Sequence, residues 1–176
     1  GRSVHRLFPT ILKEVTAMEQ QTLSFVLKLV LIGLGAAGIV IYFFVLPILG
    51  GDIAAAYPEF AYCYWPWLLF LWLTAIPCYI TLVFGWSIAT EIGRDNSFCI
   101  KNAVSLRNIA LLAAGDAVFF FAGNVLYLFL NMNHPAVFLF SCFIVFFGTA
   151  IAVAAACLSH LVYKAAKLRE ENDLTI

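Results

Sequence analysis

The chain has 176 residues, of which 64% are hydrophobic and only 11% are charged, and its mean hydropathy is +0.97. Soluble domains carry about 25% charged residues, so this composition excludes a soluble globular protein and indicates an integral membrane protein. The net charge is zero, but every Lys and Arg falls within residues 2–28, 94–107 or 164–169.

Residues 1–17 carry apolar side chains at helical spacing. This segment is expected to be either an interfacial helix or an arm foreign to the natural protein. Residues 18–176 are expected to form a single membrane domain with four spans.

The first span is predicted over residues 23–49, because about 20 apolar residues cross a bilayer. Lys28 lies inside its cytoplasmic end and can extend to the headgroups. Small residues at 33–38 allow another helix to approach closely. Pro47 and the glycine pair at 50–51 are predicted to end the helix.

The second span is predicted over residues 66–90, after a loop at 50–65 that carries aromatic and acidic residues but no basic ones. Pro77 is predicted to kink this span. The third span is predicted over 108–130 and the fourth over 136–163. The fourth carries a stripe of small residues suited to close helix contact, continued by His160; the stripe is Gly148, Ala152 and Ala156.

Arg94, Lys101 and Arg107 place the loop at 91–107 in the cytoplasm, because Lys and Arg beside membrane spans are retained on that side. With four spans, both termini are then also cytoplasmic. The expected fold is therefore an all-α four-helix bundle in the cell membrane, in contact with the lipid bilayer.

Asp116 is the one acidic residue well inside a predicted span, where a charged Asp costs about 2.5–3.5 kcal/mol. The other polar candidates in or beside the spans are Asn124, His160, Glu91 and Lys28. Asp116 is expected either to join a proton or ion relay with His160, Glu91 and Lys28, or to pair structurally with Lys28 or with a Ser or Thr hydroxyl.

No enzyme motif is present. The five cysteines form no C-x-x-C pair, and the three histidines are predicted on different sides of the membrane, which disfavours a metal or haem site. The nucleophile elbow is absent. Residues 33–38 match the G-x-G-x-x-G pattern by letter, but they lie inside an apolar span with no preceding strand and are expected to be a packing patch. The sequence therefore predicts no catalytic, cofactor-binding or metal-binding residue, and no direct nucleic-acid binding.

Two motifs carry a resemblance. The first is the loop Gly93-Arg-Asp-Asn-Ser-Phe98, with Asn102 and Leu106-Arg107 before a span. The second is the ending Ala166-Lys-Leu-Arg-Glu-Glu-Asn-Asp-Leu-Thr-Ile176. Both resemble the small bacterial membrane proteins grouped as domain of unknown function 2975. The resemblance covers residues 18–176, although Ser97 stands where Pro is common.

That family has no assigned activity, but its members are often encoded beside small helix-turn-helix regulators. The resemblance therefore implies a non-enzymatic regulator or sensor in the bacterial inner membrane, paired with such a protein. The implied partner face consists of Arg94, Asn96, Phe98, Lys101, Asn102, Arg107, Glu170, Glu171, Asn172, Asp173, Leu174, Thr175 and Ile176.

Other interpretations stay open. The tail at 168–176 can be captured by a partner through strand addition or can fold back on the chain's own inner surface. The chain can also form a homo-oligomer that acts as a small transporter or channel with Asp116 as its polar site, or bind a lipophilic ligand between its helices.

Overall fold

The computed structural model describes residues 4–173, with the side chains of residue 15 and of residues 18–172. The elements in chain order are α1 (Val4–Val40), the π-helix η1 (Ile41–Val45), α2 (Leu46–Ala56), the 3₁₀-helix η2 (Pro58–Cys63), α3 (Tyr64–Gly93), α4 (Ile100–Phe129) and α5 (Pro135–Asp173). Four helical stretches of the described chain are long and apolar enough to cross a membrane. The prediction of an all-helical, four-span membrane protein is confirmed.

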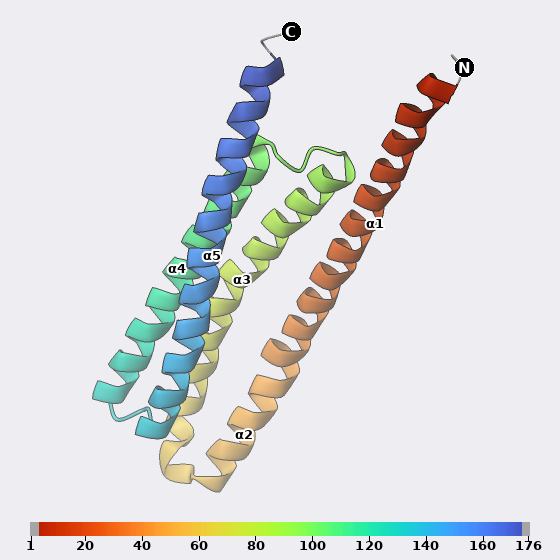
Figure 1. The fold of residues 1–176 in the computed structure, drawn as a ribbon. Coiled ribbons are helices and arrows are strands. Elements are labelled where there is room, and N and C mark those ends of the chain that lie inside the picture. The colour runs from red at the N-terminus through yellow and green to blue at the C-terminus, as the bar shows by residue number, and fades with distance from the viewer. Residues whose placement is uncertain (1–3, 174–176) are drawn as a thin grey trace.

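The helices follow one another in a row rather than around a common axis (Figure 1). α3 packs between α1 and α4, and α5 packs on α4. Over the described residues, the α1 backbone does not approach α4 or α5, and α3 does not approach α5. The beginning of α1, the end of α5 and the loop at 94–99 lie at the same end of the molecule (Figure 1), which we call the loop end.

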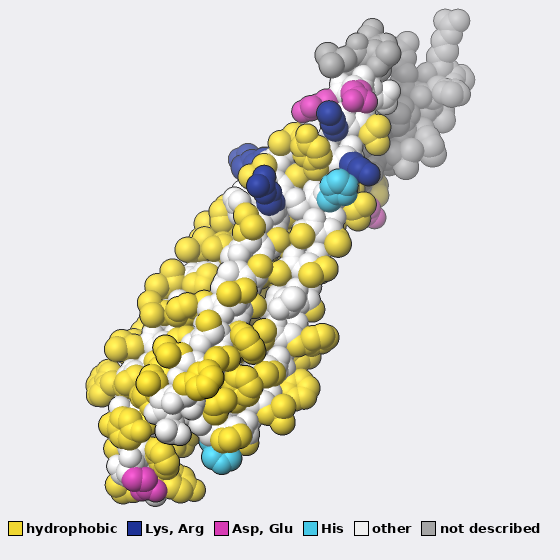
Figure 2. All heavy atoms as spheres, turned by 90° about the vertical axis from the view of Figure 1, so that its left-hand side faces the viewer, with side chains coloured by type: hydrophobic (Ala, Val, Ile, Leu, Met, Phe, Trp, Pro, Cys, Tyr) yellow, Lys and Arg dark blue, Asp and Glu magenta, His cyan; other side chains and the backbone are white. Residues whose placement is uncertain are grey.

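Hydrophobic side chains cover the middle of the molecule. Figure 2 shows this on the face formed by α4 and α5, where Lys and Arg side chains gather toward the loop end. Many of the largest apolar side chains are exposed along all four spans, among them Phe140, Phe146 and Val83. These exposed side chains face lipid, because they lie on helices long enough to cross the bilayer.

Two glycines allow α1 and α3 to lie close together. A Cβ at Gly35 would lie 3.6 Å from Leu82, and one at Gly38 would lie 2.8 Å from the Tyr79 hydroxyl oxygen. That hydroxyl donates a 2.8 Å hydrogen bond to the Gly35 carbonyl. The predicted small-residue contact is therefore confirmed at these two positions, whereas a Cβ at Gly33 would meet nothing within 4 Å.

The first span is longer than predicted, because Pro47 and the glycine pair at 50–51 do not end it. The helix passes through the π-helical turn η1 and continues as α2 to Ala56. Pro47 lies in the first turn of α2, where its missing N–H is tolerated. In lipid, a continued helix also satisfies backbone groups that water would satisfy elsewhere. The predicted loop at 50–65 is consequently mostly helical.

The α4–α5 contact follows a seam with alternating spacings of four and three residues. Gly148 lies against Ala117, Ala152 and Ala155 are buried, and the Ser159 hydroxyl donates a 2.7 Å hydrogen bond to the Ala103 carbonyl. Because a strict four-residue repeat drifts around a helix, the expected contacts at Ala156 and His160 are wrong; both residues are exposed.

Candidate functional site

Glu91, in the last turn of α3, organises the loop end. Its side chain is 7% exposed and accepts a 2.7 Å hydrogen bond from Lys101 Nζ and a 3.2 Å bond from Asn96 Nδ2. Arg94 lies 3.6 Å from the same carboxylate. The Glu91 carbonyl also accepts the backbone N–H groups of Arg94 and Asn96. One carboxylate therefore joins the end of α3, the loop and the first turn of α4.

Further hydrogen bonds hold the loop from the inside. Asn102 is 1% exposed and donates to the Ser97 carbonyl at 2.9 Å. The Ser97 hydroxyl contacts the Gln20 side chain of α1 at 3.4 Å. Asp95 takes a left-handed φ of 57°, which Asp tolerates better than most residues. The loop is thus ordered by its own side chains and tied to α1.

The structure divides the predicted partner face into two groups. Asn96 and Asn102 face inward and hold the loop, so their amides are engaged in the chain's own structure. Arg94, Phe98, Lys101 and Arg107 are exposed. The exposed group surrounds the ordered loop and is the part of the predicted face that a partner can reach.

The tail does not fold back over the described residues, because α5 continues as a helix to Asp173. Glu170, Glu171 and Asn172 are exposed on its last turns. The predicted residues Leu174, Thr175 and Ile176 lie outside the described residues.

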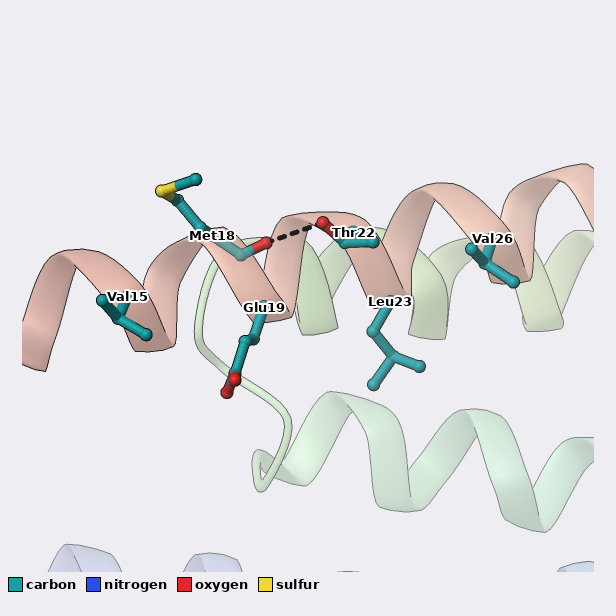
Figure 3. Close-up of a pocket in the computed structure, with 6 residues that line it drawn as sticks. All are labelled: Val15, Met18, Glu19, Thr22, Leu23 and Val26. Atoms are coloured by element: carbon teal, nitrogen blue, oxygen red, sulfur yellow. Dashed lines mark hydrogen bonds between the residues drawn. The ribbon is translucent and has the colours of Figure 1, made fainter.

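A hollow lies beside α1 at the loop end (Figure 3), and the residues that line it all come from this helix: Val15, Met18, Glu19, Thr22, Leu23 and Val26. Glu19 and Leu23 point to the side on which the 94–99 loop lies. Thr22 donates a hydrogen bond to the Met18 carbonyl of its own helix. With walls from a single helix, the hollow adds apolar surface next to the loop but encloses no ligand.

Asp116 lies in the middle of α4, on the side that faces α3 and the η1 turn of the first span. Its Oδ2 atom accepts from the Cys78 thiol of α3 at 3.8 Å, and its Oδ1 atom is buried without a partner. Tyr42 of η1 contacts the Thr74 hydroxyl of α3 at 3.4 Å. The expected pairing of Asp116 with Lys28, or with a Ser or Thr hydroxyl, is therefore not found. The donor that Asp116 does have is the Cys78 thiol.

The five polar candidates do not converge on one relay. The Lys28 ammonium lies over the Trp86 ring, 5.3 Å from its centroid, where a cation–π contact holds it. His160 is exposed on α5, and Glu91 belongs to the loop end. Among the described residues, no group of three or more His, Cys, Asp and Glu side chains could hold a metal ion.

Asn124 is buried where α4 meets α5. It is fully buried, donates to the Phe120 carbonyl at 2.8 Å and accepts from Ser141 at 2.8 Å and from Asn133 at 3.2 Å. These bonds join α4, the turn after it and α5. Such buried interhelical bonds fix the register of two membrane helices.

Comparison with known proteins supplies the family. A family model described as a protein of unknown function, DUF2975, matches residues 48–176. The chain belongs to this family. The DUF2975 chain is also 30% identical over 152 residues to the uncharacterized membrane protein YoaS of Bacillus subtilis (strain 168), an alignment that covers 85% of this chain and 95% of the relative. No solved structure matches the DUF2975 chain.

Several site residues of the DUF2975 chain escaped the sequence analysis. Cys78 and Tyr42 were not associated with Asp116, and Gln20 was not associated with the loop. Each pair joins segments far apart in the chain. Helical spacing gave no signal for them, but the position of Cys78 one residue after Pro77 marked an irregular part of the span.

Proposed function

We propose that this chain is a non-enzymatic membrane regulator or sensor that binds a small soluble helix-turn-helix regulator at its loop end. In this proposal the loop end is cytoplasmic, because it carries the basic residues. The partner class follows from the family resemblance, and the binding surface follows from the exposed residues of the loop and from the end of α5.

One observation carries the proposal: the loop is ordered before any partner binds, yet the aromatic and Arg side chains at this end, which are suited to binding a protein, are left exposed. Glu91 holds Lys101 and Asn96, while Phe98 is 56% exposed. Ordering a loop in advance lowers the entropic cost of binding. Exposed aromatic and Arg side chains are the residues that most often dominate a protein interface.

The test is co-purification of the chain in detergent with the helix-turn-helix regulator encoded beside it. Phe98→Ala and Arg107→Ala are expected to weaken the complex by about 30-fold each, as for interface residues worth about 2 kcal/mol. Phe129→Ala is the matched control, because Phe129 is an exposed aromatic at the opposite end of α4.

The control variant should retain the partner as the unsubstituted chain does. Equal retention of the regulator by Phe98→Ala, Arg107→Ala and Phe129→Ala would refute the docking surface. A deletion of residues 170–176 tests the contribution of the tail in the same assay.

The unpartnered Asp116 oxygen favours a second function, a small transporter or channel built from several copies of the chain. A row of four helices encloses no path of its own, so the path would lie between copies. Asp116→Asn should then abolish flux in reconstituted vesicles, and unchanged flux would exclude Asp116 from the path.

A further inference from the structure

Three helices bring a small polar cluster together within the membrane-spanning part of the chain. Asp116 comes from α4, Cys78 and Thr74 come from α3, and Tyr42 comes from the π-helical turn that interrupts the first span. Trp72 Nε1 donates a 2.9 Å hydrogen bond to the Tyr42 carbonyl. π-helical turns inside membrane helices are often found at functional sites.

The carboxylate in this cluster has no cationic partner among the described residues. Arg94 and Lys101 pair with Glu91 at the loop end. Lys28 is engaged by the Trp86 ring. A thiol is a weak donor, and it reaches only one of the two Asp116 oxygens, so the other stays buried and unpartnered. Leaving a buried acceptor unpartnered is unfavourable, and more so for a charged group.

The cluster is open to the bilayer. Cys78 is exposed, and Asp116 and Tyr42 are half-buried. η1 and α4, which carry Tyr42 and Asp116, do not pack against each other. Because these residues lie within helices that cross the membrane, a molecule dissolved in lipid can reach Asp116 without passing through water.

Aromatic surface lies beside the cluster. The rings of Phe43 and Trp72 are 5.7 Å apart, and the Trp72 indole hydrogen bond to the Tyr42 carbonyl joins this ring pair to the turn that carries Tyr42. Aromatic faces attract organic cations, and they do so more strongly when water is excluded. A carboxylate without a counterion beside aromatic rings in lipid is therefore suited to a cation that carries its own apolar tail.

We propose that the cluster of Asp116, Cys78, Tyr42 and Thr74 binds a membrane-dissolved amphiphilic amine. Its ammonium group contacts the half-buried Asp116 carboxylate, and its tail lies along the exposed apolar surface of α3. In a sensor this ligand would be the input that the loop end reports. Amine binding does not require the proposed binding of a regulator at the loop end, so an experiment that refutes one proposal leaves the other standing.

Dodecylamine is the probe, and dodecanol is its matched neutral control. Equilibrium dialysis against the full chain in nanodiscs of zwitterionic lipid is expected to show saturable binding of the amine and none of the alcohol. Asp116→Asn, which keeps the shape and removes the charge, should weaken amine binding by at least about tenfold. Asp52→Asn, at the opposite end from the loop, should leave it unchanged.

A second measurement does not need a variant. Bound amine should slow alkylation of Cys78 by N-ethylmaleimide in the unsubstituted chain, whereas Cys157, an exposed thiol of α5, should react at the same rate with and without the amine. Equal effects of amine and alcohol, full binding by Asp116→Asn, or no protection of Cys78 would overturn the proposal.

Discussion

Two glycines of α4 allow the cost of helix crowding in this membrane protein to be measured. A Cβ at Gly123 would overlap the Phe70 ring, whereas a Cβ at Gly115 would meet nothing within 4 Å. Phe70 is 6% exposed and cannot easily turn away, because its ring lies within 6 Å of the rings of Trp67, Phe119, Phe120 and Tyr127.

The expected magnitude follows from comparing the two alanine variants. In a helix interior, Gly→Ala stabilises by about 0.5–1 kcal/mol through backbone entropy, and this gain is common to both sites. Crowding a packed site costs about 1–3 kcal/mol, and only Gly123→Ala incurs it. Gly123→Ala should therefore be about 1–3 kcal/mol less stable to unfolding than Gly115→Ala.

Denaturation of each purified variant by sodium dodecyl sulfate in mixed micelles, followed by circular dichroism, measures this difference. Adding Phe70→Leu to Gly123→Ala should recover part of the loss, because the smaller side chain makes room, giving a coupling energy of about 0.5–3 kcal/mol. Equal stabilities of Gly123→Ala and Gly115→Ala would show that the α3–α4 contact is not closely packed at Phe70.

Two further predictions follow from buried polar groups. Asn124→Ala should destabilise the chain by about 1–3 kcal/mol in the same titration, because Ser141 and Asn133 both lose the side-chain oxygen of Asn124 as an acceptor. A change below about 0.5 kcal/mol would show that this residue does not hold α4 to α5. Glu91→Gln should speed tryptic cleavage after Arg94 and Lys101, because the loop loses its ionic contacts. Cleavage at the unsubstituted rate would mean that the loop is ordered without them.

The spans were predictable from sequence, but the helix ends were not. Runs of apolar residues identify helices that cross lipid because the cost of burying polar groups there is high. Pro47 and the glycines after it are stop signals in water, yet the helix continues to Ala56 because lipid offers its backbone no other hydrogen-bond partners. The same analysis missed the helical extension of α5 to Asp173, where polar residues had suggested a tail.

The site was predictable only in its parts. The positions of Glu91 and Lys101 beside a span suggested the loop end, but not that one carboxylate would hold the whole loop. Asp116 was conspicuous by its charge, whereas its donor was not, since the pairing with Cys78 depends on the register of α3 against α4. That register is set by contacts such as Phe70 against Gly123, which no pattern along a single helix reveals.

The row of helices also bears on how the chain is assembled during synthesis. α1 is made first and enters the bilayer before α3, the one membrane-crossing helix it packs against in the described structure, has been translated. Until then the Gly35 carbonyl lacks the Tyr79 hydroxyl, Lys28 lacks the Trp86 ring, and Ser24 lacks the Ala89 carbonyl. The first helix is therefore in lipid without its intramolecular partner until α3 has been made, and the contacts that α1 makes in the folded chain form only after the second membrane span is inserted.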